Sequence, residues 1–307
     1  MWSSPHRAVL SRADWQELQE RHVVRADELT AEHRARATRR EKHPVWDFLF
    51  TYYSYKPAVI RRWHPGAAVV LADAADAPQT TWRWYELLPG TGDVRVDVDA
   101  FWHDRGDGTE HVLALLSATS TRPARFGCFG MHEWAMVYRQ PDHRHPVPLR
   151  LGQAGTDDVV EAHDLRCTHF DAFRFFTPAA EPRNEQPLTR ASQPLLEQPG
   201  CLHAGMDLYK WALKLGPLVP GSVLLDSFEL ARDIRELDMR ASPYDLSDWG
   251  FSPIPVETAE GKAEYVRRQR VFAERGQRLR DDLIDAVTRA RPVTERVPVP
   301  EPVPVSG

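Results

Sequence analysis

Hydrophobic residues recur at helical spacing in the second half of the chain. Within residues 202–215, apolar side chains such as Leu202, Met206 and Tyr209 stand three or four positions apart, which is the pattern of a helix that buries one face. The pair Gly216-Pro217 follows directly and favours an end to the helix, because proline cannot continue it. We therefore predict a buried helix over this stretch.

Three further stretches show helical patterns with more charge. Residues 221–239 predict an amphipathic helix with Ser222 as its N-cap, and residues 257–290 predict a long arginine-rich helix. Residues 11–42 predict a long charged helix, or two, with Ser11 as the N-cap, since a serine side chain can accept a hydrogen bond from the first helical turn.

Strand patterns are shorter. Alternating apolar and polar residues predict strands in "HPVPLRLG" (145–152) and "LRCTHFDAFRFF" (165–176), because side chains of a strand alternate between its two faces. The glycine-containing stretches "LPGTGD" (88–93) and "HDRGDG" (103–108) predict turns. The sequence thus predicts an α+β fold, mainly helical, with a small β-sheet.

The elements suggest one domain over residues 1–290. Its mixed α/β part would cover about 43–180 and its helical part about 198–290. The last residues, 291–307, are rich in proline and valine, a composition typical of an extended or disordered tail.

Composition narrows the class of protein. Of 307 residues, 42% are hydrophobic and 10% aromatic, as in a folded soluble protein, and the formal net charge of −5 excludes a uniformly basic coat but not a local basic surface. The three cysteines form no CxxC pair, which suits a reducing compartment. No signal peptide and no run of about 20 apolar residues is visible, so we expect a cytoplasmic protein without membrane contact.

The stretch "FELARDIRELDMRASPYDL" (228–246) combines a charged helix with an unusual carboxylate. Glu229, Asp233 and Glu236 share one face at i,i+4 and i,i+3 spacing, and together with Arg232 and Arg235 they indicate a solvated helix with salt bridges. Asp238 differs, because a carboxylate near a helix C-terminus is unfavourable without a partner. Arg240, two residues on, is the predicted partner.

Other histidine and carboxylate pairs were weighed as metal ligands. In "FGMHEWAMVYR", His132 and Glu133 match only half of the HExxH zinc pattern, so two buried polar residues are the favoured interpretation. His169 and Asp171 would share one face of a strand and could bind a metal, orient a water, or form a plain polar pair.

A third pair of possible ligands lies on the first predicted helix. His203 and Asp207 stand at i,i+4 on it, but the Glu-x-x-His repeats of helical di-iron proteins are absent. We predict no metal.

Several stretches carry a resemblance to known enzymes. Residues 43–66, "FGMHEWAMVYR", "EQPGCLHAGMDLYKWALKL" and 228–246 together resemble a family of actinobacterial proteins labelled 3-methyladenine DNA glycosylases, over most of the chain. The layout "DLYKWALKL…DMRASPYDL" is also similar to that of the queuosine-nucleoside salvage hydrolases. These resemblances imply a DNA-glycosylase-like helical core. They place Tyr209, Lys210, Asp238 and Arg240 near the active site.

The resemblance implies a DNA glycosylase that hydrolyses an N-glycosidic bond and leaves an abasic site. Asp238 is the predicted catalytic carboxylate, because an ionised carboxylate can stabilise an oxocarbenium-like sugar cation or activate water. Arg240 or Lys210 would tune it, with Asp207 and Asp233 in reserve. The released base would be alkylated, as in DNA repair by base excision, or hypermodified, as in defence against phage. No cofactor and no obligate protein partner are expected.

Binding of modified DNA requires base flipping and stacking against aromatic side chains. The chain offers the following residues for the base: Trp46, Tyr53, Trp63, Trp134 and Tyr209, with His203 and His169 beside them. The arginines expected to contact phosphates are Arg61, Arg62, Arg122 and Arg125, and those of residues 267–280.

Three alternatives stay open at this point. The first keeps the chemistry but acts on a free nucleoside or nucleotide. The second is a helical metal-carboxylate oxygenase that uses His132, Glu133, His203 and Asp207. The third is a DNA-binding protein without enzymatic activity.

Overall fold

The computed structural model describes residues 8–140 and 146–292. The helices are α1 Arg12–Arg39, α2 Phe48–Tyr52, α3 Pro57–Ile60, α4 Val98–Ser120, α5 Met131–Ala135, α6 Gly152–Glu161, α7 Phe170–Phe173, α8 Gln193–Leu196, α9 Leu202–Leu215, α10 Gly221–Ala241 and α11 Ala259–Arg289. The strands are β1 Ala8–Leu10, β2 Val69–Leu71, β3 Tyr85–Leu87 and β4 Val94–Val96. The predicted mainly helical α+β class is confirmed.

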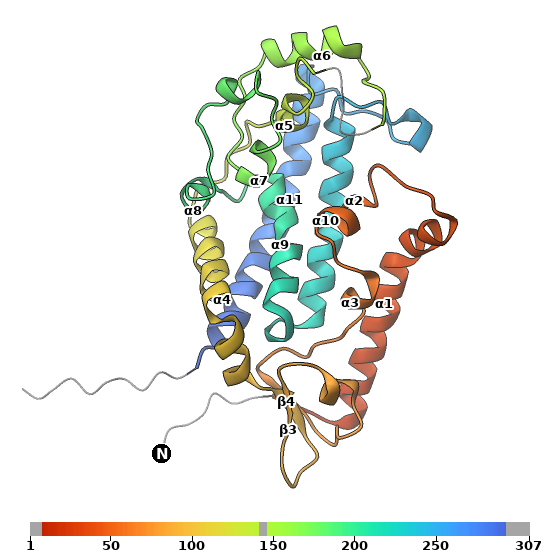
Figure 1. The fold of residues 1–307 in the computed structure, drawn as a ribbon, viewed down its shortest axis with the longest axis vertical. Coiled ribbons are helices and arrows are strands. Elements are labelled where there is room, and N and C mark those ends of the chain that lie inside the picture. Colours follow the sequence, from red (N-terminus) through yellow and green to blue (C-terminus); the bar gives the residue numbers. More distant parts are fainter. Residues whose placement is uncertain (1–7, 141–145, 293–307) are drawn as a thin grey trace, which may run out of the picture.

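A bundle of α4, α9, α10 and α11 forms the centre of the molecule (Figure 1). The sheet lies at one end of the bundle and the short helices α5 to α7 lie at the other. Leu208 of α9, Leu230 of α10 and Leu283 of α11 are fully buried in the largest hydrophobic cluster. A Cβ atom at Gly205 would come within 2.9 Å of Ile234, so a glycine lets α9 and α10 approach closely.

The helix ends follow from local chemistry. Ser11 caps α1 by accepting a hydrogen bond from the backbone N–H of Asp14, as predicted. α9 ends at Gly216, whose φ is 53°, a value that glycine adopts without strain. The predicted cap of α10 is wrong, since Pro220 holds the N-cap position and the exposed Ser222 lies inside the helix.

The small sheet comes from a part of the chain where no strand was predicted. Among the described residues its order is β1-β2-β4-β3, with β1 and β2 parallel and the other pairs antiparallel. The strands predicted at 145–152 and 165–176 are wrong within the described residues, which form isolated bridges and α7. The buried Phe173 and Phe176 are three positions apart, so the apolar residues there follow a turn of helix.

Of the two predicted turns, one is confirmed and one is wrong. Residues 88–93 form the predicted turn between β3 and β4, but residues 103–108 lie inside α4. The tail from residue 293 onward lies outside the described residues. No helix in the described ranges combines the length and apolar character needed to cross a membrane.

Candidate functional site

Two buried polar clusters lie side by side, between α9, α10 and the short helices α5 and α7. The first, called here the Asp238 cluster, contains His132, Glu133, His203, Arg235 and Asp238.

The second, called here the Asp207 cluster, contains His169, Asp171, Glu197, Asp207 and Lys210. The helices α5, α9 and α10 thus bring together residues more than 100 positions apart.

The Asp238 cluster is built on an ion pair between α5 and α10. His132 Nε2 lies 2.9 Å from Asp238 Oδ1, and both side chains are almost completely buried. Burial alone would raise the pKa of Asp238, but the positive charge and hydrogen bond of His132 hold it below its usual value. Burial likewise opposes the charge on His132, and Asp238 nevertheless raises its pKa well above the ordinary one. The two groups therefore form a charged pair inside the protein.

Arg235 connects this ion pair to a second carboxyl group. Its Nη1 lies 3.3 Å from Glu133 Oε1 and 3.5 Å from Asp238 Oδ2, and its guanidinium stacks on Phe48 at 4.0 Å. Burial and the nearby charge of Asp238 raise the pKa of Glu133. Glu133 thus takes up a proton more readily than Asp238 does.

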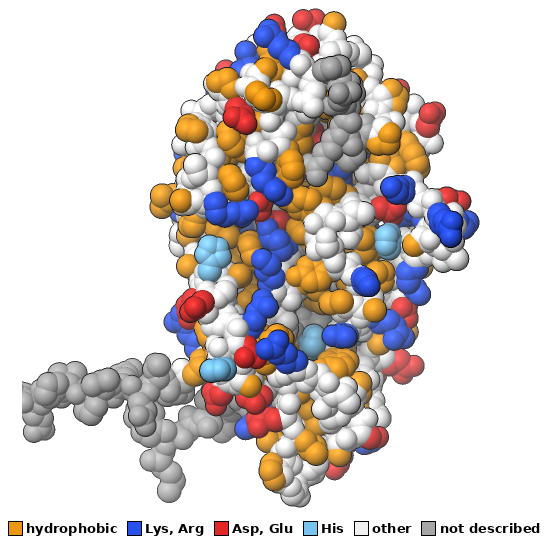
Figure 2. Space-filling view, viewed as in Figure 1, with side chains coloured by type: hydrophobic (Ala, Val, Ile, Leu, Met, Phe, Trp, Pro, Cys, Tyr) orange, Lys and Arg blue, Asp and Glu red, His pale blue; other side chains and the backbone are white. Residues whose placement is uncertain are grey.

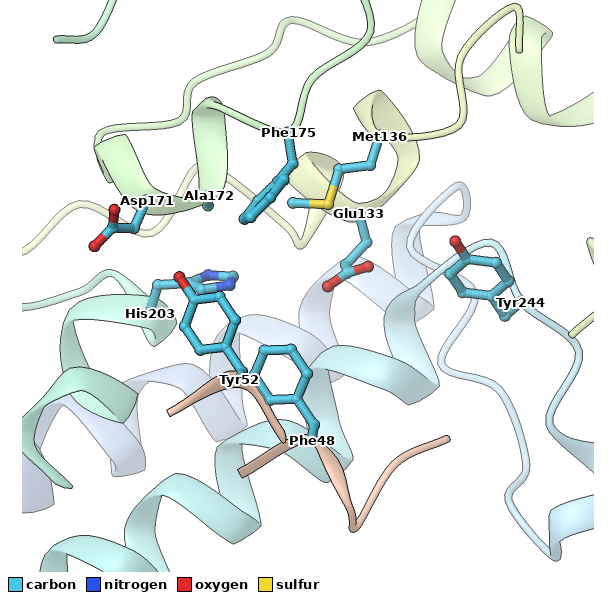
Figure 3. A pocket seen from close by; sticks show the side chains of 9 residues that line it. All are labelled: Phe48, Tyr52, Glu133, Met136, Asp171, Ala172, Phe175, His203 and Tyr244. Atoms are coloured by element: carbon cyan, nitrogen blue, oxygen red, sulfur yellow. The ribbon is translucent and has the colours of Figure 1, made fainter. Parts of the chain in front are cut away.

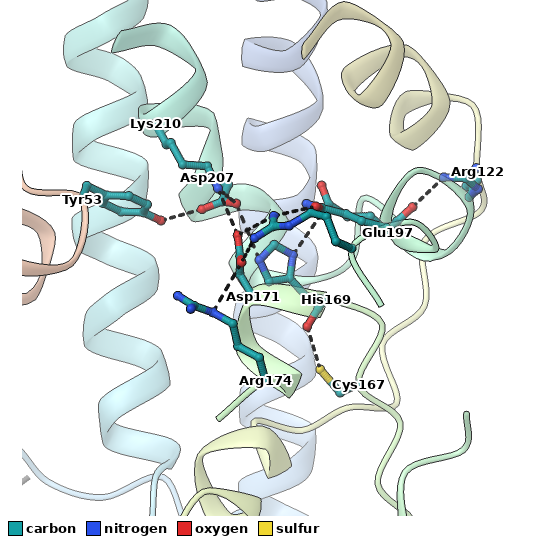
Figure 4. Close-up of polar contacts among 11 residues, drawn as sticks. Tyr53, Arg122, Cys167, His169, Asp171, Arg174, Glu197, Asp207 and Lys210 are labelled. Atoms are coloured by element: carbon teal, nitrogen blue, oxygen red, sulfur yellow. Dashed lines mark hydrogen bonds and ion pairs between the residues drawn. The ribbon is translucent and has the colours of Figure 1, made fainter. Parts of the chain in front are cut away.

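The Asp207 cluster holds its central carboxylate from three sides (Figure 4). Tyr53 donates a hydrogen bond of 2.9 Å to Asp207 Oδ1, Lys210 contacts Oδ2, and His169 Nε2 lies 3.6 Å from Oδ2. His169 Nδ1 in turn lies 3.0 Å from Glu197 Oε2. Burial opposes the charge on Lys210, but Asp207 raises its pKa, so this amine stays protonated.

Asp171 forms the outer edge of the Asp207 cluster. Its carboxylate accepts a hydrogen bond of 2.8 Å from Arg190 and lies 3.5 Å from both Lys210 and Arg174. Burial opposes ionisation of this carboxyl, but the charge of Lys210 and the hydrogen bond from Arg190 lower its pKa. Asp171 is therefore ionised at neutral pH.

His203 stands between the two clusters. The centroid of its ring lies 4.4 Å from that of His132 and 5.4 Å from that of His169. Burial, together with the positive charge of His132, lowers its pKa well below the ordinary value. It accordingly holds a neutral imidazole, and among the described residues it has no hydrogen-bond partner.

A pocket opens onto these groups (Figure 3). Glu133, His203 and Asp171 are among its lining residues, and the carboxylate of Asp171 points outward, away from His203, toward Arg174, Arg190 and Lys210. The rest of its lining is mostly apolar and consists of Phe48, Tyr52, Met136, Ala172, Phe175 and Tyr244. The volume open to solvent is about 20 Å³, which suits one water molecule.

Both clusters contain histidine and carboxylate groups of the kind that bind metal ions. The ligand atoms of His132, Glu133, His203 and Asp238 lie within 4.8 Å of one another, and the same holds for a second group formed by His169, Asp171 and Asp207. Cationic side chains of the protein already balance the carboxylates in both clusters.

This charge balance bears on a metal at His132 in particular. A metal there would have to displace the proton shared with Asp238, because bound histidine is neutral. As an ion pair, His132 and Asp238 can hold and transfer a proton.

Asp238, Asp207 and Lys210 lie in this region, whereas Arg240 and the reserve Asp233, which pairs with Arg275, do not. Asp238 has a partner, as expected, but the partner is His132 and not Arg240. The Arg240 guanidinium contacts Glu236 and the carbonyl of Ser252 instead. Asp207 and Lys210 bind each other, and Asp238 lies behind the pocket rather than in its lining.

Only some of the predicted base-binding residues lie at the site. Tyr53 and His169 belong to the Asp207 cluster, and His203 lines the pocket. Trp134 and Tyr209 are fully buried in the core, so neither offers a face for stacking.

Two of the predicted tryptophans pack elsewhere. Trp46 packs with Phe251, and Trp63 packs with Trp15 beside the sheet. Phe48, Tyr52 and Phe175 supply aromatic walls of the pocket in their place.

The arginines predicted to bind phosphate have other contacts or lie elsewhere. Arg61 pairs with Asp27, and Arg62 lies over Trp82. Arg122 donates hydrogen bonds to the carbonyls of Glu197 and Pro194, and the exposed Arg125 follows it in the loop after α4.

Arg235 and Glu197 are the site residues that sequence reasoning missed. Arg235 was assigned to a solvated helix face, yet it is 1% exposed. A signal existed, since Phe228, Ala231, Arg235 and Asp238 follow one another at three- and four-residue spacing. For Glu197, in the loop before α9, the sequence offers no comparable pattern.

No protein-family model matches this chain, and no significant match was found among curated proteins or solved structures.

Proposed function

We propose that this protein hydrolyses an N-glycosidic bond and releases a modified base from DNA. One observation carries the proposal: two carboxyl groups with opposite tendencies to hold a proton line the same pocket. The pKa of Glu133 is raised by burial and by Asp238, whereas that of Asp171 is lowered by Lys210 and Arg190 against the effect of burial. Carboxyl pairs with separated pKa values are typical of glycoside-cleaving sites.

The chemistry assigns a role to each group in the pocket. Glu133 donates a proton to the leaving base. Asp171, as a carboxylate, stabilises the positive charge that develops on the sugar. The neutral His203 can hydrogen-bond to the attacking water, whose proton returns to the Glu133 carboxylate.

Asp238 acts in this proposal as a positioning residue. It holds the protonated His132 and lies 3.5 Å from Arg235, and its charge raises the pKa of Glu133. The prediction of a catalytic Asp238 becomes a proposal in which Asp238 prepares Glu133 as the acid.

The pocket must widen before it can hold a flat ligand such as a base. Phe48 and Tyr52 stack on each other at 4.9 Å and form one wall, and aromatic walls are what a flipped base requires. The present pocket has room for about one water molecule, which is far less than a base needs. Entry of a base therefore requires α2, which carries both rings, to move outward. The DNA-glycosylase-like core belongs to this same proposal.

The experiment incubates the purified protein with alkylated DNA, with hypermodified phage DNA, and with the corresponding nucleosides. Mass spectrometry then detects released bases, and alkaline cleavage detects abasic sites. The proposal predicts base release from DNA without added metal. Release from nucleosides alone would favour the nucleosidase alternative. Stoichiometric iron together with oxygen consumption would overturn hydrolysis in favour of the oxygenase.

A further inference from the structure

A line of basic side chains leads away from the pocket along α9. It is called here the basic track and consists of Arg174, Arg190, Lys210, Lys214 and Arg105. Figure 2 shows Lys and Arg side chains gathered in a line down the middle of this face, over α9. The net charge of −5 leaves room for a local basic surface of this kind.

The track begins at the pocket itself. Arg174, Arg190 and Lys210 all converge on the carboxylate of Asp171, at 3.5, 2.8 and 3.5 Å. The side chains of Arg174 and Arg190 are 45% and 59% exposed. Three cations thus meet one carboxylate at the pocket, and two of them also face solvent.

Beyond the pocket, the basic track continues with the cations of Lys214 and Arg105. The ammonium groups of Lys210 and Lys214 lie over the same ring of Trp211, at 4.2 and 5.2 Å. Partial burial and then the charge of Lys210 lower the pKa of Lys214, with Arg105 and Arg190 adding to the effect. Within the described residues, neither Lys214 nor Arg105 forms an ion pair. A surface on which these two cations lie near Lys210 without ion pairs of their own favours an anionic partner.

Aromatic side chains accompany the cations. Tyr52 lines the pocket. The half-buried Tyr55 is close enough to Arg105 and Lys210 for their positive charges to act on its hydroxyl group. Cations that follow a backbone, combined with aromatic rings on which bases can stack, are typical of surfaces that bind single-stranded nucleic acid.

We propose that the basic track binds the sugar–phosphate backbone of a DNA strand and leads one base of that strand into the pocket. This inference rests on the proposed function and deepens it, because it selects a polynucleotide over a free nucleoside. It also replaces the arginines at 61, 62, 122 and 125 as the phosphate contacts. Lys214 and Arg105 lie away from the pocket lining, so they can be changed without touching the catalytic groups.

The test measures binding of a fluorescent single-stranded oligonucleotide without modified bases, by anisotropy, at several salt concentrations. The Lys214→Gln/Arg105→Gln variant should lower the slope of log K against log salt by about 1.4, because each phosphate contact on a single strand contributes about 0.7. The matched control, Arg61→Gln/Arg62→Gln, removes the same charge from the two positions that follow α3, and should leave the slope unchanged. Thermal melting of both variants establishes that they are folded.

Each outcome decides one point. An unchanged slope in the track variant, an equal loss in the control, or no binding of oligonucleotides overturns the track. Because the oligonucleotide carries no modified base, the result does not depend on catalysis. Track-dependent binding without release of any base would leave the track intact and overturn the proposed chemistry. Hydrolysis of nucleosides without oligonucleotide binding would overturn the track and the DNA substrate, and would leave only the cleavage of an N-glycosidic bond.

Discussion

Removal of the Arg235 guanidinium tests whether the Asp238 cluster is held by charge balance. The guanidinium is 1% exposed and lies 3.3 Å from Glu133 and 3.5 Å from Asp238. At an effective dielectric constant of about 20, each pair contributes a gross attraction of roughly 5 kcal/mol. Removal of one partner from a buried ion pair costs about 3–5 kcal/mol net. Arg235→Met should therefore lower the free energy of unfolding by that amount at pH 7.

The stability lost in Arg235→Met should depend on pH in a defined direction. Without the guanidinium, the raised pKa of Glu133 rises further and the lowered pKa of Asp238 rises toward its ordinary value, so between pH 7 and 5 the folded variant binds more protons than the folded wild type. Its stability should increase relative to the wild type as the pH falls from 7 to 5. Urea denaturation at both pH values measures the difference.

A second variant supplies the control. In Arg235→Met/Glu133→Gln the charges of His132 and Asp238 still balance, so about 2 kcal/mol of the loss should return. A loss below about 1 kcal/mol in the single variant, or no recovery in the double variant, would refute the argument from charge balance.

Two further predictions concern stability. The pKa of His132 is raised, so its contribution to folding stability is complete below about pH 6.5 and disappears as the pH rises through the folded-state pKa. The pKa of Asp238 is lowered, so its contribution to folding stability is complete above about pH 4 and disappears as the pH falls through the folded-state pKa. His132→Gln should thus lose most stability between about pH 4 and 6.5 in urea titrations, and a uniform loss at every pH would contradict the ion pair. For Gly261→Ala, whose Cβ would come within 2.0 Å of the Pro255 carbonyl oxygen, thermal melting should show a loss of at least about 1 kcal/mol, whereas Gly108→Ala on the open surface of α4 should gain about 0.5–1 kcal/mol. Equal effects of the two alanines would show that the close approach at Gly261 is not a constraint.

The long helices were predictable because their signals are local. The apolar period of α9 and its end at Gly216 can be read within a few residues. The sheet could not be read in this way, because β1 pairs with β2, which lies about 60 positions later. Three-residue strands are also too short to show a period.

The site was partly predictable for a similar reason. Asp238 stood out because a carboxylate near a helix end requires a partner, and the structure supplies one. The partner is His132, 106 positions away, and a single sequence carries no signal for such a pairing. Arg235 was misassigned because its charge fits a solvated helix, although its position on α10 matches the buried face.

The central claim is that Glu133 and Asp171 share the work of breaking a glycosidic bond. Single-turnover release of a base from the DNA that proves to be the substrate tests it most directly, with Glu133→Gln and Asp171→Asn compared to the wild-type protein. Each variant should release base at least about 100-fold more slowly, because a positioned acid or base contributes about 10²–10⁴ in rate, while its melting temperature stays close to that of the wild type. Wild-type rates in either folded variant would contradict the proposal.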